Sequence, residues 1–92
     1  MSSSQPRITL YDRRDCPHCE QARVQLQRLA PVLGFALNSL DVDTDLDLTQ
    51  RYGDRVPVVA LDDCELLAAP FDEAALRAAL SLALAVRPGD RA

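Results

Sequence analysis

"ITLYDRRDCPHCEQA", residues 8–22, joins an apolar, β-branched run to a charged loop and then to two cysteines separated only by Pro17 and His18. The first run, within residues 7–11, is typical of a short strand. From Pro17 the pattern becomes helical, because proline suits the first turn of a helix, where its missing N–H costs no hydrogen bond. The stretch therefore predicts a strand, a loop and a helix that begins at the cysteine pair.

The helix that follows is predicted from apolar residues at the three- and four-residue spacing of one face. These residues are Ala22, Leu26, Leu29, Ala30 and Leu33. Pro31 predicts that the helix ends or kinks near Leu29, and Gly34 closes the segment.

The middle of the chain predicts a second strand and a short second helix. Residues 35–42 are strand-like. Thr44 is the expected N-cap of the helix, and Asp45 and Asp47 in its first turn favour the helix dipole. Gly53, a residue suited to the position after a helix, predicts where it ends.

The C-terminal half predicts a hairpin and a last helix. Residues 56–67 contain two apolar runs around an acidic turn, with Pro57 at the start of a strand or on an edge. The last helix is expected from Asp72, as its N-cap, to Val86, with Pro88 as its stop. The alternation of strands and helices predicts an α/β domain whose mixed sheet carries packed helices, beginning with a right-handed parallel unit.

Length and composition limit the class of protein. A chain of 92 residues holds one modest core, which we assign to residues 7–87, with a disordered tail at 1–6 and a second tail at 88–92. The net charge of −4 argues against nucleic acid, because phosphate binding needs a basic face. The N-terminus lacks a secretory pattern and no apolar run reaches the ~18 residues of a membrane span, so a cytoplasmic protein without membrane contact is expected.

Cys16 and Cys19 are the candidate catalytic residues. At a helix N-cap, Cys16 would meet free backbone N–H groups and the positive end of the dipole, which favour the nucleophilic thiolate. Cys19 lies one turn further, where its sulfur can resolve a mixed disulfide. Pro17 and His18 are expected to tune the pair, although His18 is mostly neutral at pH 7 and its effect is modest.

Two other interpretations of the cysteine pair stay open at this point. Cysteines on an apolar helix face can be inert core residues. A zinc site needs four ligands, and the candidates in this chain are His18 and the three cysteines, without a second CxxC. No metal is therefore expected. Cys64, the remaining cysteine, is either an ordinary strand residue or an exposed thiol open to glutathionylation or cross-linking.

The stretches "ITLY", "DRRD", "CPHC" and "VPVV" together resemble glutaredoxin-like proteins of the thioredoxin superfamily, in particular the small bacterial glutaredoxin-like family. The stretches that carry the resemblance are Leu10–Ala22, Tyr52–Val58 and Phe71–Leu76. The resemblance implies a thioredoxin-like fold, with a four-stranded mixed sheet flanked by three helices. It also implies that Cys16 and Cys19 interconvert between dithiol and disulfide.

The resemblance further implies a substrate site. The Val56–Pro57 bond would be cis, and the backbone of Val56 would pair with an extended thiol substrate such as glutathione, as in β-strand addition. Asp72 lies near an aspartate that holds glutathione in typical glutaredoxins, whose Gly-Gly pair is replaced here by Ala68–Ala69.

A lysine that precedes the first cysteine in such proteins is absent from this chain. Arg13 or Arg14 could replace it as a point charge near the substrate, or could simply belong to a solvated loop. Both arginines are therefore kept as candidate substrate-binding residues.

These observations predict a monomeric thiol–disulfide oxidoreductase of cell redox homeostasis. Cys16 would attack a disulfide in a client protein or a glutathione mixed disulfide, and Cys19 would resolve the intermediate. No bound cofactor is expected, and glutathione is a candidate co-substrate. The alternatives are a non-catalytic redox-sensing or partner-binding module and, less favoured, a metal or iron–sulfur carrier.

Overall fold

The structure is a computed structural model that describes residues 5–62 and 64–85. Its strands are β1 (Arg7–Asp12), β2 (Ala36–Asp41), β3 (Val58–Leu61) and β4 (Cys64–Ala68). Its helices are α1 (Pro17–Leu33), a 3-10 turn η1 (Val42–Thr44), α2 (Leu46–Tyr52) and α3 (Glu73–Ala85). The predicted order of strands and α-helices is confirmed, and the predicted tails fall almost wholly outside the described residues.

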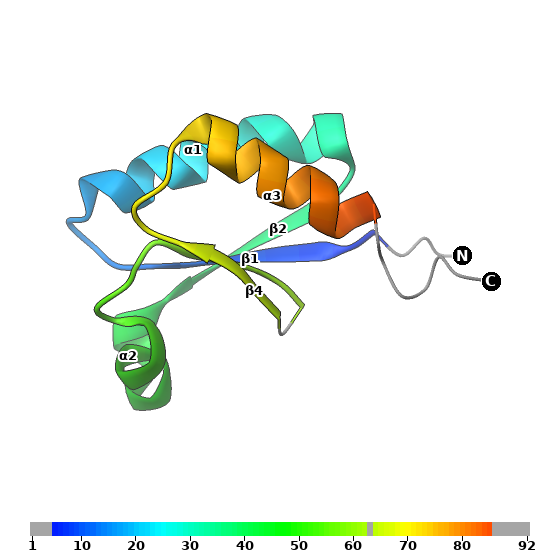
Figure 1. Cartoon of the computed structure of the whole chain (residues 1–92). Helices are drawn as coiled ribbons and strands as arrows, with labels where there is room; N and C mark the ends of the chain where they lie inside the picture. The colour runs from blue at the N-terminus through cyan, green and yellow to red at the C-terminus, as the bar shows by residue number, and fades with distance from the viewer. Residues whose placement is uncertain (1–4, 63, 86–92) are drawn as a thin grey trace.

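The strands form a mixed sheet in the order β2-β1-β3-β4. β1 runs parallel to β2, while β3 is antiparallel to both β1 and β4. Helices α1 and α3 lie side by side over one face of the sheet, and α2 lies beyond the opposite face (Figure 1). This arrangement confirms the thioredoxin-like fold and brings the start of α1 to the end of the sheet where β1 ends and β3 begins.

The main core fills the space between the sheet and the two paired helices. Ile8 and Leu10 of β1 point into it and are fully buried, as are Leu26 of α1 and Leu76 and Leu80 of α3. A smaller cluster lies on the other face, where Val42, Tyr52 and Val58 are buried beneath α2. Each face of β1 therefore packs on a different helical layer, which fixes the strand at the centre of the domain.

Pro31 was predicted to end or kink α1 near Leu29, and the structure shows that the helix does not end there. The helix continues through Pro31 to Leu33, and Gly34 then closes it in the left-handed conformation, with φ 82° and its N–H donated to the Ala30 carbonyl at 2.8 Å. A proline so close to the end removes a single hydrogen bond, while Leu29 and Leu33 still pack on the core. Packing of this apolar face therefore outweighs the proline, and the prediction that Gly34 closes the segment is confirmed.

The prediction that Thr44 caps α2 is also wrong. Asp45 is the N-cap, and its carboxylate accepts the N–H of Asp47 at 2.8 Å. Thr44 instead ends η1 and donates its hydroxyl to the Asp41 carbonyl at 2.7 Å. Several short polar residues in this segment can cap a helix, and the burial of Val42 selects among them because it fixes where η1 ends.

The end of α2 and the start of α3 lie close to their predicted positions. Gly53 follows α2 as expected, although with φ −54° it is right-handed rather than left-handed. A Cβ at this position would lie 2.5 Å from the Thr49 carbonyl oxygen, which explains the glycine. Asp72 caps α3 as predicted, since its carboxylate accepts the N–H of Ala75 at 2.8 Å. No helix in the described part of the chain is long and apolar enough to cross a membrane.

Candidate functional site

The cysteine pair lies at the junction between β1 and α1. Asp15 turns the chain with a positive φ of 53°, a conformation that aspartate tolerates better than most residues. Cys16 is then the N-cap of α1, and its Sγ accepts the backbone N–H of Cys19 at 3.1 Å. Pro17 opens the helix, as predicted. The Cys16 sulfur therefore faces a backbone donor and the positive end of a 17-residue helix.

The two cysteines are joined by a disulfide, with their Cα atoms 5.2 Å apart. Cys16 is partly exposed and borders a shallow surface depression shared with Asp15 and Glu20. Cys19, in contrast, has an exposed fraction of 0%. An incoming sulfur can therefore reach Cys16 from solvent, whereas Cys19 is accessible chiefly through Cys16.

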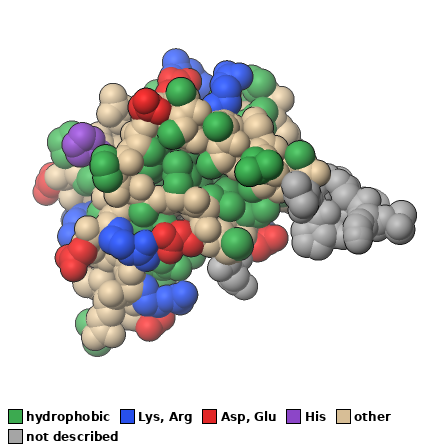
Figure 2. Space-filling model, viewed as in Figure 1, with side chains coloured by type: hydrophobic (Ala, Val, Ile, Leu, Met, Phe, Trp, Pro, Cys, Tyr) green, Lys and Arg blue, Asp and Glu red, His purple; other side chains and the backbone are tan. Residues whose placement is uncertain are grey.

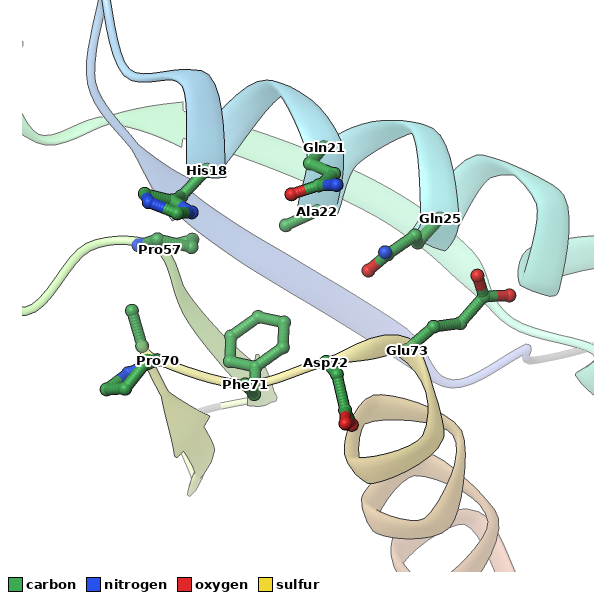
Figure 3. Close-up of a pocket in the computed structure, with 10 residues that line it drawn as sticks. His18, Gln21, Ala22, Gln25, Pro57, Pro70, Phe71, Asp72 and Glu73 are labelled. Atoms are coloured by element: carbon green, nitrogen blue, oxygen red, sulfur yellow. The ribbon is translucent and has the colours of Figure 1, made fainter.

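A groove of about 280 Å³ lies beneath α1, and it is lined by His18, which lies between the two cysteines in sequence, but by neither cysteine. Its lining consists of His18, Gln21, Ala22, Gln25, Pro57, Ala69, Pro70, Phe71, Asp72 and Glu73. His18 and Pro57 face each other at one end, Phe71 points up toward Ala22 in the middle, and Gln25 and Glu73 lie at the other end (Figure 3). The site therefore combines a candidate reactive pair with a groove along which an extended ligand can lie.

Two of the residues predicted for the substrate site, Pro57 and Asp72, line this groove, whereas Val56 packs against the smaller cluster. Pro57 is buried and lines the groove, and the Val56–Pro57 bond is cis, as the resemblance implied. Asp72 also lines it, with an exposed side chain that already accepts the Ala75 N–H. Val56 directly precedes Pro57 and lies outside β3. The Ala69–Pro70 bond is cis as well, which was not predicted.

Several groove residues were missed by the sequence analysis. The sequence analysis gave no role at the site to Gln21, Gln25, Pro70, Phe71 or Glu73. The register of α1 could have identified its share of the lining, because positions 18, 21, 22 and 25 repeat at the spacing of one helix face. Nothing in the sequence shows that Pro70 and Phe71 lie opposite that face, because their position depends on how β4 leads into α3.

The loop that carries Cys16 is held at both ends by arginines. The Arg13 guanidinium donates to both carboxylate oxygens of Asp43 at 3.0 Å and to the Gly53 carbonyl at 3.1 Å. Arg23 bridges the carboxylates of Asp12 and Glu20, at 3.2 and 2.7 Å. These bonds tie the end of β1 to η1, α2 and α1. The loop before Cys16 is therefore fixed relative to the helix that it caps.

The structure thus gives Arg13 a defined set of partners outside the groove lining. Arg14 is exposed and does not line the groove either. Cys64 is an exposed free cysteine at the start of β4, paired in register with Leu61 at the end of β3, a strand length from Pro57. Within residues 5–62 and 64–85, no group of three His, Cys, Asp or Glu side chains could hold a metal ion.

Asp43→Asn is expected to lower the melting temperature more at pH 7 than at pH 3. The hydrogen bond from Arg13 holds the pKa of Asp43 below its ordinary value of 3.8. A carboxylate with a lowered pKa in the folded state adds stability above its unfolded pKa and loses it as the pH falls through the folded value. Thermal melts of wild type and variant across this range measure the difference.

Asp47→Asn is the matched control, because that exposed carboxylate lies 3.8 Å from Arg51 and makes a weaker contact. Its effect should be smaller at pH 7. An equal loss for Asp43→Asn at both pH values would show that the ion pair with Arg13 does not fasten the loop.

Fold and site together define a thioredoxin-fold protein with a CxxC disulfide at the N-terminus of its first helix. The comparison with family models narrows this class: residues 7–81 match the glutaredoxin-like domain (DUF836), and the chain belongs to this family. It is 34% identical over 93 residues to the "Uncharacterized protein Rv0508" of Mycobacterium tuberculosis, covering 96% of each chain. The same figures hold for the "Uncharacterized protein Mb0520" of Mycobacterium bovis.

Two solved structures of similar proteins agree with this fold. Protein XcR50 from X. campestris superposes with a TM-score of 0.70 at 39% identity, covering 83% of this chain and 97% of that one. Protein Ne2328 from Nitrosomonas europaea superposes with a TM-score of 0.68 at 29% identity, covering 85% of this chain and 94% of that one. The family and the fold therefore rest on the sequence and on structure alike.

Proposed function

We propose that the protein is a thiol–disulfide oxidoreductase that cycles between a Cys16–Cys19 dithiol and the disulfide. The observation that carries the proposal is the joint geometry of the pair, with Cys16 partly exposed at the N-cap of α1 and Cys19 buried. A disulfide between a partly exposed and a buried cysteine at the start of a helix favours a redox-active role over a purely structural one. The cytoplasm, where thiols are kept reduced, is the compartment in which such a cycle reduces other disulfides.

In the proposed cycle, the Cys16 thiolate attacks one sulfur of a client disulfide. A bond forms between Cys16 and that sulfur, and the client's other sulfur leaves as a thiolate that takes up a proton. Cys19, deprotonated, then attacks the Cys16 sulfur and releases the first client sulfur as a thiolate. The client gains two electrons, and the protein retains the Cys16–Cys19 disulfide until an external thiol or dithiol reduces it.

The helix start supports both steps. The N–H of Cys19 donates to Sγ of Cys16 at 3.1 Å, and such a donor stabilises negative charge on the sulfur. His18 on the rim of the groove can add to this when protonated. Val56 and Pro57 would align the substrate by strand-like pairing, and Asp72 would contact it further along the groove.

The substrates proposed at this stage are disulfides in proteins and mixed disulfides with glutathione, the latter making glutathione a co-substrate. Arg13 and Arg14 are near enough in sequence to Cys16 to influence an approaching anion, although neither lines the groove. A monomer is sufficient for the cycle, because both reactive sulfurs lie in one chain.

The experiment that tests the proposal is turnover of insulin with dithiothreitol, together with reduction of a peptide–glutathione mixed disulfide in a glutathione-coupled assay. We expect activity in at least one assay, and a Cys16–Cys19 disulfide by mass spectrometry of the oxidised protein. Absence of turnover in both, with that disulfide present, would favour a redox-sensing or partner-binding module. Pairing of Cys64 with either cysteine, and never Cys16 with Cys19, would contradict the assignment.

A further inference from the structure

We infer that the groove selects an extended segment of a client protein that carries a basic side chain about three residues from its reactive cysteine, in preference to glutathione. This inference rests on the proposed oxidoreductase function and specifies its substrate class. The charge and the shape of the groove lining support this inference.

The groove lining contains no arginine that could oppose the charge of a carboxylate ligand. Its ten residues include the carboxylates of Asp72 and Glu73 and the amides of Gln21 and Gln25, but no arginine, and the chain contains only one histidine, His18. At neutral pH glutathione carries two carboxylates and one ammonium, and oxidised glutathione carries four carboxylates and two ammoniums. An ammonium can pair with Asp72 or Glu73, but the lining supplies no arginine for the carboxylates, and the net charge of the ligand is negative. Its binding is therefore electrostatically less favourable than that of a segment with a basic side chain.

The start of α3 is also occupied by the chain's own carboxylate. A helix N-terminus ordinarily attracts anions through its free N–H groups. Here the Asp72 carboxylate accepts the Ala75 N–H at 2.8 Å and places a negative charge at the positive end of the helix. The end of the groove that could otherwise have received a substrate carboxylate is therefore partly neutralised.

Arg28 on α1, which pairs with a residue of the lining, does not change this balance. Arg28 donates to the Glu73 carboxylate at 2.9 Å, so its charge is already compensated. Both side chains remain substantially exposed, at 62% for Arg28 and 42% for Glu73. An incoming basic side chain can therefore share the Glu73 carboxylate from solvent, whereas an acidic one meets Glu73 and Asp72 without a free partner.

The rest of the lining suits a peptide backbone rather than a small anion. Pro57, Pro70 and Phe71 supply apolar surface, and Gln21 and Gln25 supply amides that can both donate and accept. Hydrophobic side chains also gather across the middle of the face that contains β4, with charged groups above and below them (Figure 2).

The length of the groove sets the position of the basic residue. From His18 to Gln25 the helix rises by about 10 Å, which corresponds to ~3 residues of extended chain. A client segment whose cysteine reacts at Cys16 would therefore bring its third neighbour toward Glu73. The reaction is the exchange described above, with the client disulfide reduced and a dithiol reagent as the final reductant.

The test compares three substrates at pH 8, with dithiothreitol as reductant. Two are peptide disulfides, identical except for lysine or glutamate three residues to either side of the cysteine, and the third is oxidised glutathione. We expect kcat/KM to be about three- to tenfold higher for the lysine peptide than for the glutamate peptide at low salt, as for an exposed ion pair gained or lost. The ratio should fall as salt is raised, and glutathione should be the poorest substrate.

Substitutions of opposite sign separate charge selection from damage to the fold. Glu73→Gln removes the carboxylate and frees Arg28, so the lysine-to-glutamate ratio should fall to about one or below. Arg28→Gln removes the compensating charge, so the ratio should rise. Asp47→Asn on α2, beyond the opposite face of the sheet, removes one negative charge at a distance and should leave the ratio unchanged.

The outcomes distinguish this inference from the proposed function. If wild type reduces all three substrates equally at low salt, or prefers glutathione or the glutamate peptide, charge selection is overturned while oxidoreductase activity stands. If it reduces none of them, both are overturned. A ratio that moves in the same direction in Glu73→Gln and Arg28→Gln would also contradict the assignment of Glu73 as the selecting residue.

Discussion

Cys16→Ser should reduce disulfide turnover to the rate of the reductant alone, a loss of about a thousandfold or more, as when the nucleophile of a covalent mechanism is removed. A serine hydroxyl is not ionised at neutral pH and cannot replace the thiolate, even though it can still cap α1 and preserve the fold. Insulin reduction by wild type and variant, with circular dichroism to check folding, measures the effect.

Cys19→Ser should behave differently from Cys16→Ser. Cys16 would still attack, but its mixed disulfide could not be resolved within the chain, so a covalent adduct with the client should accumulate and be visible as a mass increase. Cys64→Ser is the control, because that cysteine lies at the start of β4 and should not affect turnover. Adduct formation by Cys16→Ser, but not by Cys19→Ser, would reverse the assigned roles.

Leu26→Ala has the largest expected effect on stability. Leu26 is fully buried in the main core, on the face of α1 that packs against the sheet. Truncating such a leucine costs about 2–5 kcal/mol, because it removes buried apolar surface and leaves a cavity. A small domain has only about 5–15 kcal/mol of stability, so the variant should lose a large part of it.

Urea denaturation of the oxidised protein measures this change, and Val32→Ala provides the control. Val32 lies on the same helix but is 67% exposed, so its truncation should change the free energy of unfolding by no more than about 0.5 kcal/mol. Similar losses in both variants would mean that α1 is not anchored through its Leu26 face.

The sequence predicted the fold well where patterns are local. The apolar spacing of α1 and the Asp72 cap both appear as expected, because each depends on residues within a turn or two of one another. The ends of the elements were less reliable. Pro31 did not stop α1 and Thr44 did not cap α2, since packing of Leu33 and Val42 decided between locally acceptable alternatives.

For the site, too, residues related by local spacing were predictable, whereas those brought together by the fold were not. The sequence indicated Cys16 as an N-cap and Cys19 as a sulfur within its reach, because Cys19 lies one helical turn further along the chain. Their pairing and the place of Pro57 came from resemblance to a family. The groove itself could not be derived from the sequence, because it joins α1 to a β4–α3 connection about fifty residues away.

By itself, the sequence therefore determined the order of the elements and the two cysteines that we propose as the reactive pair. Only the tertiary structure decided that Arg13 fastens the loop to Asp43, and that Glu73 and Phe71 lie along the same groove as His18. The physical reason is the range of the interactions. Helix periodicity, caps and CxxC spacing act within a few residues, whereas a groove and its charge arise when distant segments are packed together by burial of the core.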